Sequence, residues 1–395
     1  MMRKLLFVST VVLFLQPLSA QFVTLNSKNG TAAHTPIEIM IKQPDKKNTY
    51  GLYNSNTKKT YPIQWYDRGH ALFILDDEVS PGASLGLEIR KITATGTPFK
   101  TIRNNNGIEM SVNDKPVFFY HTAIADPPAD SPSYYKRSGF IHPLYSPGGT
   151  IMTDDFPSNH AHQHAVFHAW TNNTFQKQQV DFWNQHQLTG TIQHKEVLST
   201  TDGPVFSELK TTQEYVSLKA GIVLTETWTI RVYPFSDRFM FDLHVDQTNI
   251  TKDTLYLNKY IYGGMAFRGS REWDPFNKKN YKNPWNILTS DGFKDSLGNN
   301  TSARWVTAYG MINGSMSAAT VFNYSSNIRY PQKIRVHPNM PYWVYAPVID
   351  GDMYIAPGGK YSAVYRYYVS NEIPDNTLLE RIHENWIVPP MYIKK

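Results

Sequence analysis

The stretch GIVLTETWTIRVYP, residues 221–234, alternates apolar and polar side chains and ends at a proline. Successive side chains of an extended strand point to opposite faces, so this alternation predicts a β-strand with one buried face. The stretch RFMFDLHVDQT, residues 238–248, follows after a short turn-forming segment and repeats the pattern. We therefore predict that both segments are strands of a β-sandwich.

The same alternation recurs along the chain in residues 37–42, 84–92, 254–264 and 361–370. Aromatic residues make up 14% of the chain, and 25 prolines and 23 glycines interrupt it, which favours many short strands joined by turns. Only NTLLERIHENW, residues 376–386, has the spacing of an amphipathic helix. The predicted fold class is all-β, a large β-sandwich with a smaller N-terminal β unit and a short C-terminal helix.

The first twenty residues have the three parts of a secretory signal peptide. Arg3 and Lys4 precede an apolar run, residues 5–15, and Leu18-Ser19-Ala20 forms a small-residue cleavage site. The apolar run is too short to cross a bilayer comfortably. We therefore predict export to the periplasm or the extracellular space, with no membrane insertion after signal cleavage.

The mature chain divides at a polar stretch, residues 93–106, that links two β-rich parts. We predict a signal peptide over 1–20, a small N-terminal β unit over 21–100 and a large β-sandwich domain over 101–395. The oligomeric state is left open.

Charge and cysteine content exclude several classes of function. Without Arg3 and Lys4 the mature chain keeps 37 basic and 33 acidic residues, so its formal charge falls from +6 to +4. These charges form no basic cluster, so nucleic acid is not an expected partner. The chain has no cysteine. Thiolate catalysis is therefore excluded, and any metal ion must be held by His, Asp or Glu.

The stretch NHAHQHAVFH, residues 159–168, is the main candidate site. His160, His162, His164 and His168 all have even numbers, so on an extended strand they would share one face. Such a row can hold a divalent metal ion through His160, His162 and His164, with Asp154 and Asp155 completing or orienting the ligand shell.

Two other interpretations of this row stay open. The histidines can perform metal-free acid–base chemistry on a sugar, with a carboxylate such as Asp155 or Glu226 accepting a proton. They can also be polar packing groups, which is what we expect of isolated histidines such as His186.

Polar and aromatic residues elsewhere are candidates for holding a substrate. Arginine offers a planar fork of donors, and aromatic rings pack against the C–H faces of sugars. The candidate substrate-binding residues are His142, Arg268, Arg304, Trp305 and His337.

Six segments together resemble the PmoA-like family, exported bacterial proteins of unknown function that carry the label "methane oxygenase". The segments are HPLYSPGG (142–149), DDFPSNHAHQH (154–164), FHAW (167–170), YGGMAFR (262–268), ARWV (303–306) and HPNMPYW (337–343). The resemblance extends over about residues 22–370. This sequence departs from the family pattern at Asn159, where an aspartate is usual, and at His164 and Ala165, where arginine and glycine are common.

The resemblance implies a sandwich of the galactose-mutarotase-like (supersandwich) kind and a carbohydrate substrate. The oxygenase label derives from a membrane protein built of spanning helices, and beyond the signal this chain has no segment of that kind. We therefore expect an exported carbohydrate-active enzyme, a hydrolase, lyase or epimerase. Its catalytic residues would be His160, His162, His164 and Asp155.

Two alternative functions are kept. One is a non-catalytic glycan-binding module in which Trp305 contacts the sugar and the histidines only pack. The other is a metal-dependent oxidative enzyme, as the family label suggests.

Overall fold

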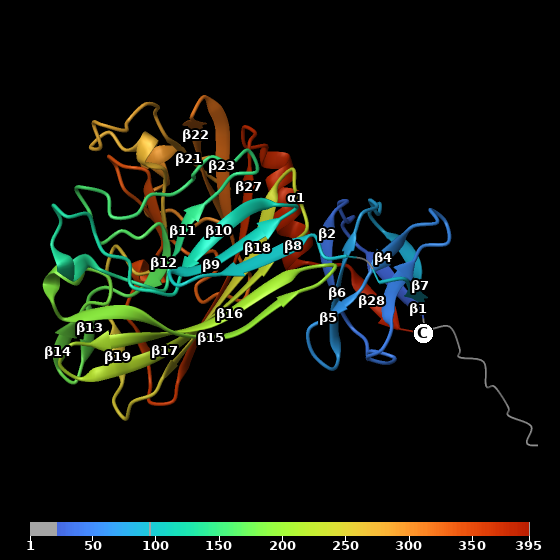
Figure 1. Ribbon diagram of the computed structural model, residues 1–395, viewed down its shortest axis with the longest axis horizontal. Coiled ribbons are helices and arrows are strands. Elements are labelled where there is room, and N and C mark those ends of the chain that lie inside the picture. The colour runs from blue at the N-terminus through green and yellow to red at the C-terminus, as the bar shows by residue number, and fades with distance from the viewer. Residues whose placement is uncertain (1–21, 95, 395) are drawn as a thin grey trace, which may run out of the picture.

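A computed structural model describes residues 22–94 and 96–394 of the chain (Figure 1). The strands form five sheets, arranged as a small unit and a large sandwich, and Figure 1 shows the two parts side by side with the helix α1 between them. The predicted signal peptide, residues 1–20, lies outside the described residues.

The small unit consists of two sheets that enclose a core of their own. The five-stranded sheet has the order β28 (Met391–Lys394), β1 (Phe22–Ser27), β7 (Ala83–Ile92), β3 (Thr49–Tyr53) and β4 (Thr60–Pro62). The three-stranded sheet has the order β2 (Thr35–Met40), β6 (His70–Leu75) and β5 (Gln64–Trp65). Alternation fixes the buried face, as in β2, where Ile37 and Ile39 are fully buried.

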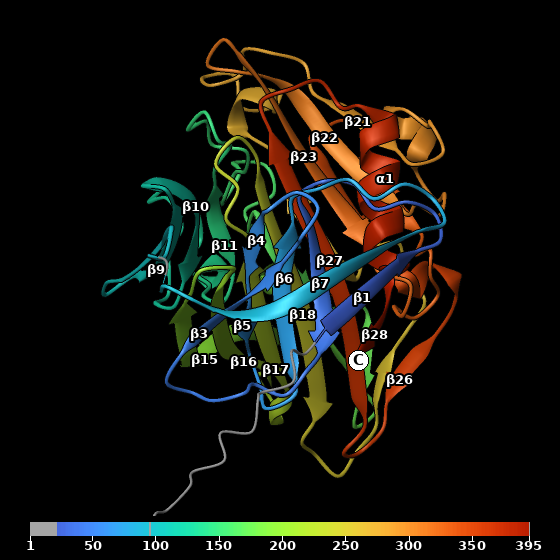
Figure 2. The same ribbon diagram turned by 90° about the vertical axis from the view of Figure 1, so that its right-hand side faces the viewer.

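The last strand of the chain belongs to this small unit. β28 pairs antiparallel with β1, and Figure 2 shows the two strands side by side. The sequence analysis had assigned these C-terminal residues to the large unit, because their pattern carries no sign of the strand they pair with. The small unit is therefore built from both ends of the described chain.

One layer of the sandwich, which we call the long-strand sheet, contains the segments that opened the sequence analysis. Its order is β15 (Gly190–Asp202), β16 (Ser207–Ser217), β17 (Gly221–Val232), β18 (Phe239–Asn249), β27 (Lys360–Ser370), β23 (Ser315–Asn323), β22 (Trp305–Ile312) and β21 (Asn286–Thr289). β17 and β18 pair antiparallel with Trp228 opposite Val245, and both side chains are buried in the core.

The other layer, which we call the loop-bearing sheet, carries the candidate site. Its order is β24 (Ile334–Val336), β25 (Tyr342–Tyr345), β20 (Gly264–Arg268), β12 (Val166–Ala169), β11 (Ile141–Leu144), β10 (Lys115–His121), β9 (Gly107–Val112) and β8 (Phe99–Arg103). Side chains of both eight-stranded sheets share one large hydrophobic core.

The remaining elements are short. A four-stranded sheet has the order β14 (Gln178–Val180), β13 (Asn173–Phe175), β19 (Leu255–Leu257) and β26 (Met353–Ile355). Five 3-10 helices occur among the described residues: η1 (Ser133–Tyr135), η2 (Gln185–Gln187), η3 (Arg271–Trp273), η4 (Asp295–Gly298) and η5 (Pro347–Asp350).

The α-helix α1 (Asn376–Ile387) forms where the sequence predicted it. The Asp375 side chain accepts hydrogen bonds from the N–H groups of Thr377 and Leu378, which caps the first turn. Leu379 is buried with residues of the long-strand sheet. No helix of the described residues is long and apolar enough to span a membrane.

The predicted fold class is confirmed: the protein is all-β, with a large sandwich, a smaller N-terminal β unit and, over residues 22–94 and 96–394, one α-helix. One predicted strand, residues 254–264, is only partly correct, because the chain leaves the extended conformation after β19. Gly263 and Gly264 have φ values of 136° and 132°, which glycine adopts readily and other residues avoid. These two glycines redirect the chain into β20 of the loop-bearing sheet.

Candidate functional site

The loop-bearing sheet has an inner face toward the long-strand sheet. His168 of β12 points inward, since its Nδ1 lies 3.1 Å from the hydroxyl of Tyr215 on β16. Tyr345 of β25 also points inward, since its hydroxyl donates to the carbonyl oxygen of Val321 at 2.9 Å. Residues one position away on the same strands therefore point to the opposite, outer face.

Arg268 and Tyr342 lie on that outer face as a directly opposed pair between β20 and β25. Both side chains are nevertheless buried, because loops cover this part of the sheet. Gln163, in the loop that leads into β12, accepts a hydrogen bond of 2.9 Å from Nη1 of Arg268. The outer face of β12, β20 and β25 is thus the floor on which the histidine loop rests.

The histidine loop differs from its prediction. β12 begins only at Val166, so His160, His162 and His164 do not share one face of a strand. The N–H of His160 donates to the carbonyl oxygen of Pro157, and the N–H of Gln163 donates to that of His160, both at 2.9 Å. These successive turns break the extended conformation on which the even-number argument depended.

Four imidazole rings gather here, and three of them belong to predicted site residues: His160, His162 and His337. The ring of His160 lies with its centroid 5.5 Å from that of His162 and 5.7 Å from that of His337. The ring of His162 lies 5.7 Å from that of His186 in η2. We call His160, His162, His186 and His337 the imidazole cluster. His186 was expected to be a packing residue, and no sequence spacing connects it to the loop.

Burial keeps much of the cluster uncharged. It lowers the pKa of His162 to about 3 and that of His337 to about 4, with a further contribution from neighbouring His160. Burial and the charge of Arg268 also lower the pKa of His160. Nδ1 of His160 is buried without a hydrogen-bond partner among the described residues. A neutral imidazole can donate at one nitrogen and accept at the other, as hydroxyl groups require.

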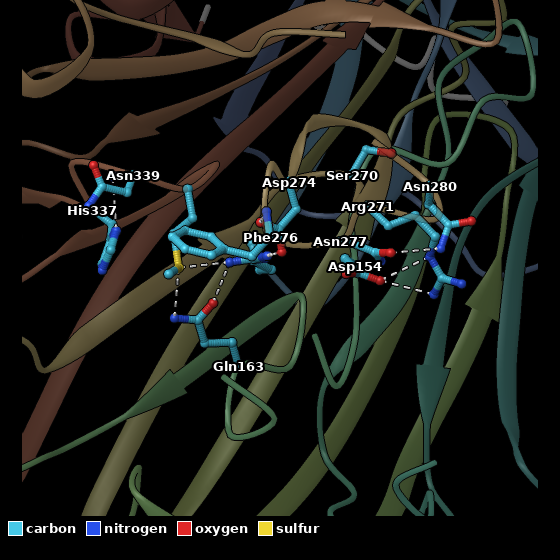
Figure 3. Close-up of polar contacts among 12 residues, drawn as sticks. Asp154, Gln163, Ser270, Arg271, Asp274, Phe276, Asn277, Asn280, His337 and Asn339 are labelled. Atoms are coloured by element: carbon cyan, nitrogen blue, oxygen red, sulfur yellow. Dashed lines mark hydrogen bonds and ion pairs between the residues drawn. The ribbon is translucent and has the colours of Figure 1, made fainter. Parts of the chain in front are cut away.

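A buried ion pair supports the cluster from below. Arg268 and Asp274 form a salt bridge in which neither side chain is exposed, and Nη1 of Arg268 also contacts Sδ of Met340 at 2.9 Å. In the view of Figure 3, Gln163 and Asp274 lie between His337 on one side and Asp154 with Arg271 on the other. The structure therefore brings the predicted residues Arg268 and His337 into the same neighbourhood as His160.

His164 is separate from the cluster. Its Nδ1 lies 2.9 Å from Oδ1 of Asp155 and its Nε2 lies 2.9 Å from Oε1 of Gln185, so both ring nitrogens are engaged. The predicted metal set of His160, His162 and His164 therefore does not fit an ion. Among the residues that the structure describes, no group of three or more His, Asp or Glu side chains is arranged to hold a metal.

The two adjacent aspartates point to different partners. Burial raises the pKa of Asp155 to about 7, and this carboxyl contacts His164 beneath the loop instead of the imidazole cluster. Burial also raises the pKa of Asp154 to about 6, and its Oδ1 lies 2.9 Å from a guanidinium nitrogen of Arg271. Asp154 and Arg271 lie beside a pocket that His142 lines.

Arg304 and Trp305 do not reach this site. Trp305 has no exposed surface, and its Nε1 donates to Oε1 of Glu380 in α1 at 2.9 Å. Arg304 forms salt bridges with Asp291 and with the same glutamate. The prediction that Trp305 offers a ring to a sugar is wrong, because packing against α1 covers that ring.

Glu226 is also remote from the cluster. Its carboxylate is fully buried between the two large sheets, where it accepts from the Tyr215 hydroxyl at 2.8 Å and contacts Nδ1 of His168 at 3.0 Å. Nε1 of Trp228 completes this network at 2.7 Å. Glu226 and His168 therefore link the two layers of the sandwich.

The fold and the site together define a two-unit β-sandwich protein whose loop-bearing sheet carries a loop-covered cluster of imidazoles. The chain belongs to the family of unknown function DUF6807, whose model matches residues 107–384. That range includes every residue of the imidazole cluster. No curated protein matches the sequence. The resemblance to the PmoA-like family stays a prediction.

Several solved structures are similar to this chain at low sequence identity. An alpha-mannosidase from Enterococcus faecalis V583 has a TM-score of 0.38 and 10% identity, over 95% of this chain and 46% of that one. A protein of glycosyl hydrolase family 38 from Enterococcus faecalis has a TM-score of 0.39 and 10% identity, over 96% and 48%. This chain thus spans about half the length of these two proteins. A galactose mutarotase related enzyme from Lactobacillus acidophilus has a TM-score of 0.29 and 9% identity, over 70% of this chain and 100% of that one.

Proposed function

We propose that this protein is a carbohydrate-active enzyme whose imidazole cluster binds and activates the hydroxyl groups of a glycan. The observation that carries the proposal is the convergence of His160, His162 and His337 from two distant loops, with Nδ1 of His160 buried and without a hydrogen-bond partner among the described residues. Burying an imidazole nitrogen without a partner costs free energy unless a ligand or water supplies the missing hydrogen bond.

Neutral imidazoles suit a substrate rich in hydroxyl groups. Each ring can accept a proton from a hydroxyl at one nitrogen and donate an N–H to a developing negative oxygen at the other. Tyr135 adds an aromatic ring with its centroid 6.5 Å from that of His162. The reaction type, whether hydrolysis, elimination or epimerisation, follows from which sugar oxygen or carbon the cluster contacts.

The supporting charges help to keep His160 neutral. The ion pair of Arg268 with Asp274 is fully buried, so the positive charge beside His160 is compensated but still disfavours protonation of that ring. We assign Arg268 a positioning role beneath the histidines, because its terminal nitrogens Nη1 and Nη2 are engaged with Asp274, Gln163 and Met340. His164 and Asp155 likewise act through the loop that they anchor.

The substrate for the test is identified by screening purified protein against a panel of polysaccharides. Hydrolysis is detected by new reducing ends, and elimination by unsaturated products. On that substrate, His160→Ala and His337→Ala should each lower kcat/KM by at least about 100-fold, the scale of a lost acid–base group. His34→Ala is the matched control, since His34 is an exposed histidine paired with Asp76 in the small unit. Unchanged turnover in both cluster variants would reject the proposal.

Export of the mature chain is part of the proposal and is tested separately. The motif over residues 1–20 supports export by its basic start, apolar run and cleavage site. N-terminal sequencing of the protein from a periplasmic or culture fraction should begin at Gln21. Retention of the full chain in the cytosolic fraction would contradict export without affecting the catalytic proposal.

A further inference from the structure

A pocket of about 280 Å³ opens beside the segment that joins β20 to η3. Its polar lining residues are His142, Thr153, Ser270, Arg271, Glu272 and Asn313. The pocket is distinct from the imidazole cluster, none of whose residues lines it. The N–H of Asp154 donates to the carbonyl oxygen of Arg268 at 3.2 Å, so the two sites are held together by one short stretch of backbone.

The charges at the pocket are already balanced. Arg271 pairs with Asp154 at 2.9 Å, and Oε1 of Glu272 pairs with Lys282 at 3.0 Å. A charged ligand would have to compete with one of these pairs and leave a partly buried charge without its partner, which is unfavourable. An uncharged ligand with several hydroxyl groups can bond to Arg271 and Glu272 while both pairs stay intact.

The remaining lining residues favour the same class of ligand. Nδ1 of His142 lies 3.0 Å from Oγ1 of Thr153, and burial lowers the pKa of this histidine to about 3, so it is neutral. The apolar side chains of Ile151 and Ile312 form part of the wall. Polar groups combined with an apolar surface match the hydroxyl and C–H faces of a pyranose ring.

The size of the pocket limits the ligand. Its volume of about 280 Å³ lies just below the roughly 300–1,000 Å³ that is usual for clefts holding small molecules. It therefore accommodates one ring and not an extended chain. We infer that this pocket, the Arg271 pocket, binds one uncharged sugar unit of the glycan through Arg271, Glu272 and the neighbouring hydroxyl-bearing side chains, an assignment that rests on the proposed function.

The test uses the methyl glycosides of glucose, galactose, mannose and xylose as neutral probes, and methyl glucuronoside as the acidic one. Saturation-transfer NMR and calorimetry on the mature chain should detect saturable binding of at least one neutral probe. Arg271→Ala and the pocket-filling Ile151→Trp should each weaken it by at least 10-fold. Arg238→Ala, which removes an arginine from the Arg238–Asp237 surface pair, is the control and should leave it unchanged.

Three results would overturn the assignment: no neutral probe binds, binding survives both pocket variants, or methyl glucuronoside binds more tightly than every neutral probe. Circular dichroism of each variant shows whether it is folded, and Ile151→Trp keeps the Arg271–Asp154 pair if Arg271→Ala fails to fold. Failure of the pocket is distinguishable from failure of the proposed function. If only the pocket assignment fails, His160→Ala still lowers kcat/KM by at least about 100-fold while Ile151→Trp leaves it unchanged.

Discussion

The imidazoles of His160 and His337 lie with ring centroids 5.7 Å apart although the two residues are far apart in the sequence. Their proximity follows from the strand order. β12 and β25 flank β20 and are both antiparallel to it, so they run parallel to each other. His160 lies in the loop that enters β12, and His337 lies in the loop that enters β25. Both loops therefore leave the sheet at the same end.

We expect His162 and His337 to stay neutral down to mildly acidic pH, because burial lowers their pKa values to about 3 and about 4. In two-dimensional NMR spectra of the imidazole groups, their resonances should not shift between pH 8 and pH 5.5. His162→Gln and His337→Gln identify the signals. A midpoint above pH 5.5 for either ring would contradict the burial that the structure gives them.

Replacing Asp274 by asparagine should destabilise the protein by about 3–5 kcal/mol, because it leaves the buried guanidinium of Arg268 without its counter-ion. Chemical denaturation at neutral pH measures the change. Asp237→Asn is the control: its partner Arg238 is partly exposed and the carboxyl is 67% exposed, so the loss should be about 0–1 kcal/mol. Equal effects in the two variants would show that the Arg268 pair is not buried.

At pH 6 the proton between Asp155 and Nδ1 of His164 should be carried by the Asp155 carboxyl, which donates it in a hydrogen bond to the neutral imidazole. The side-chain Nε2–H of Gln185 donates to the carbonyl oxygen of Lys136 at 2.8 Å, so Oε1 of the same side chain faces Nε2 of His164, which must carry a hydrogen. Nδ1 then accepts from Asp155, whose pKa is raised to about 7 by burial.

Asp155→Asn keeps a donor toward Nδ1 of His164, so it should cost less free energy of unfolding than Asp155→Ala at pH 6. The N–H of Phe156 loses its Oδ1 acceptor in both variants, whereas only the alanine variant also leaves Nδ1 unpaired, at a further cost of about 1–3 kcal/mol. Urea denaturation of both variants decides the comparison. If asparagine costs as much as alanine, the pair is a carboxylate with an imidazolium.

Acidification below pH 6.5 should destabilise the protein partly through His162. Its pKa falls from 6.5 to about 3 on folding, so between these values the unfolded chain binds more protons than the folded one. Stability contributed by the neutral ring is therefore present above pH 6.5 and lost as the pH falls toward 3. His162→Asn should make this dependence shallower, by at most about 1.4 kcal/mol per pH unit.

Denaturation midpoints at pH 6.5, 5.5 and 4.5 test this slope. The comparison with wild type isolates His162, because Asp154 and Asp155, with raised pKa values, contribute the opposite slope in both proteins. Asn159→Ala, an exposed position in the same loop that does not titrate, is the control. If the stability of the His162→Asn variant depends on pH as steeply as that of wild type, His162 does not contribute to the pH dependence.

Trp305→Ala should lower stability by about 3–5 kcal/mol, because it removes a fully buried ring from the contact between the long-strand sheet and α1. It should not change the affinity for a methyl glycoside. Glu380→Ala, which removes the hydrogen-bond acceptor of this ring and the partly exposed salt bridge to Arg304 but leaves the ring in place, should cost only about 1–2 kcal/mol. Loss of sugar binding in a folded Trp305 variant would show that the Trp305 ring does belong to the binding site.

Sequence reasoning proposed a site from the density of histidines in residues 159–168, and the structure places Arg268 and His337, two other proposed site residues, beside His160. The sequence prediction misplaced His164, because it assumed that residues two apart lie on one face of an extended strand. The chain instead forms turns after Pro157, so the histidine side chains do not alternate between two faces. His186 was beyond its reach. No local pattern records that η2 folds against the histidine loop.

By itself the sequence determined the all-β class, the strands β17, β18 and β27, and the helix α1, because alternation and capping are local properties of the chain. Only the tertiary structure decided that β28 returns to β1, that α1 covers Trp305, and that the loops before β12 and β25 meet. Strand order and loop packing depend on contacts between distant residues. The alternation of side chains along one strand determines which residues share a face. The neighbouring strands and loops determine which residues that face contacts.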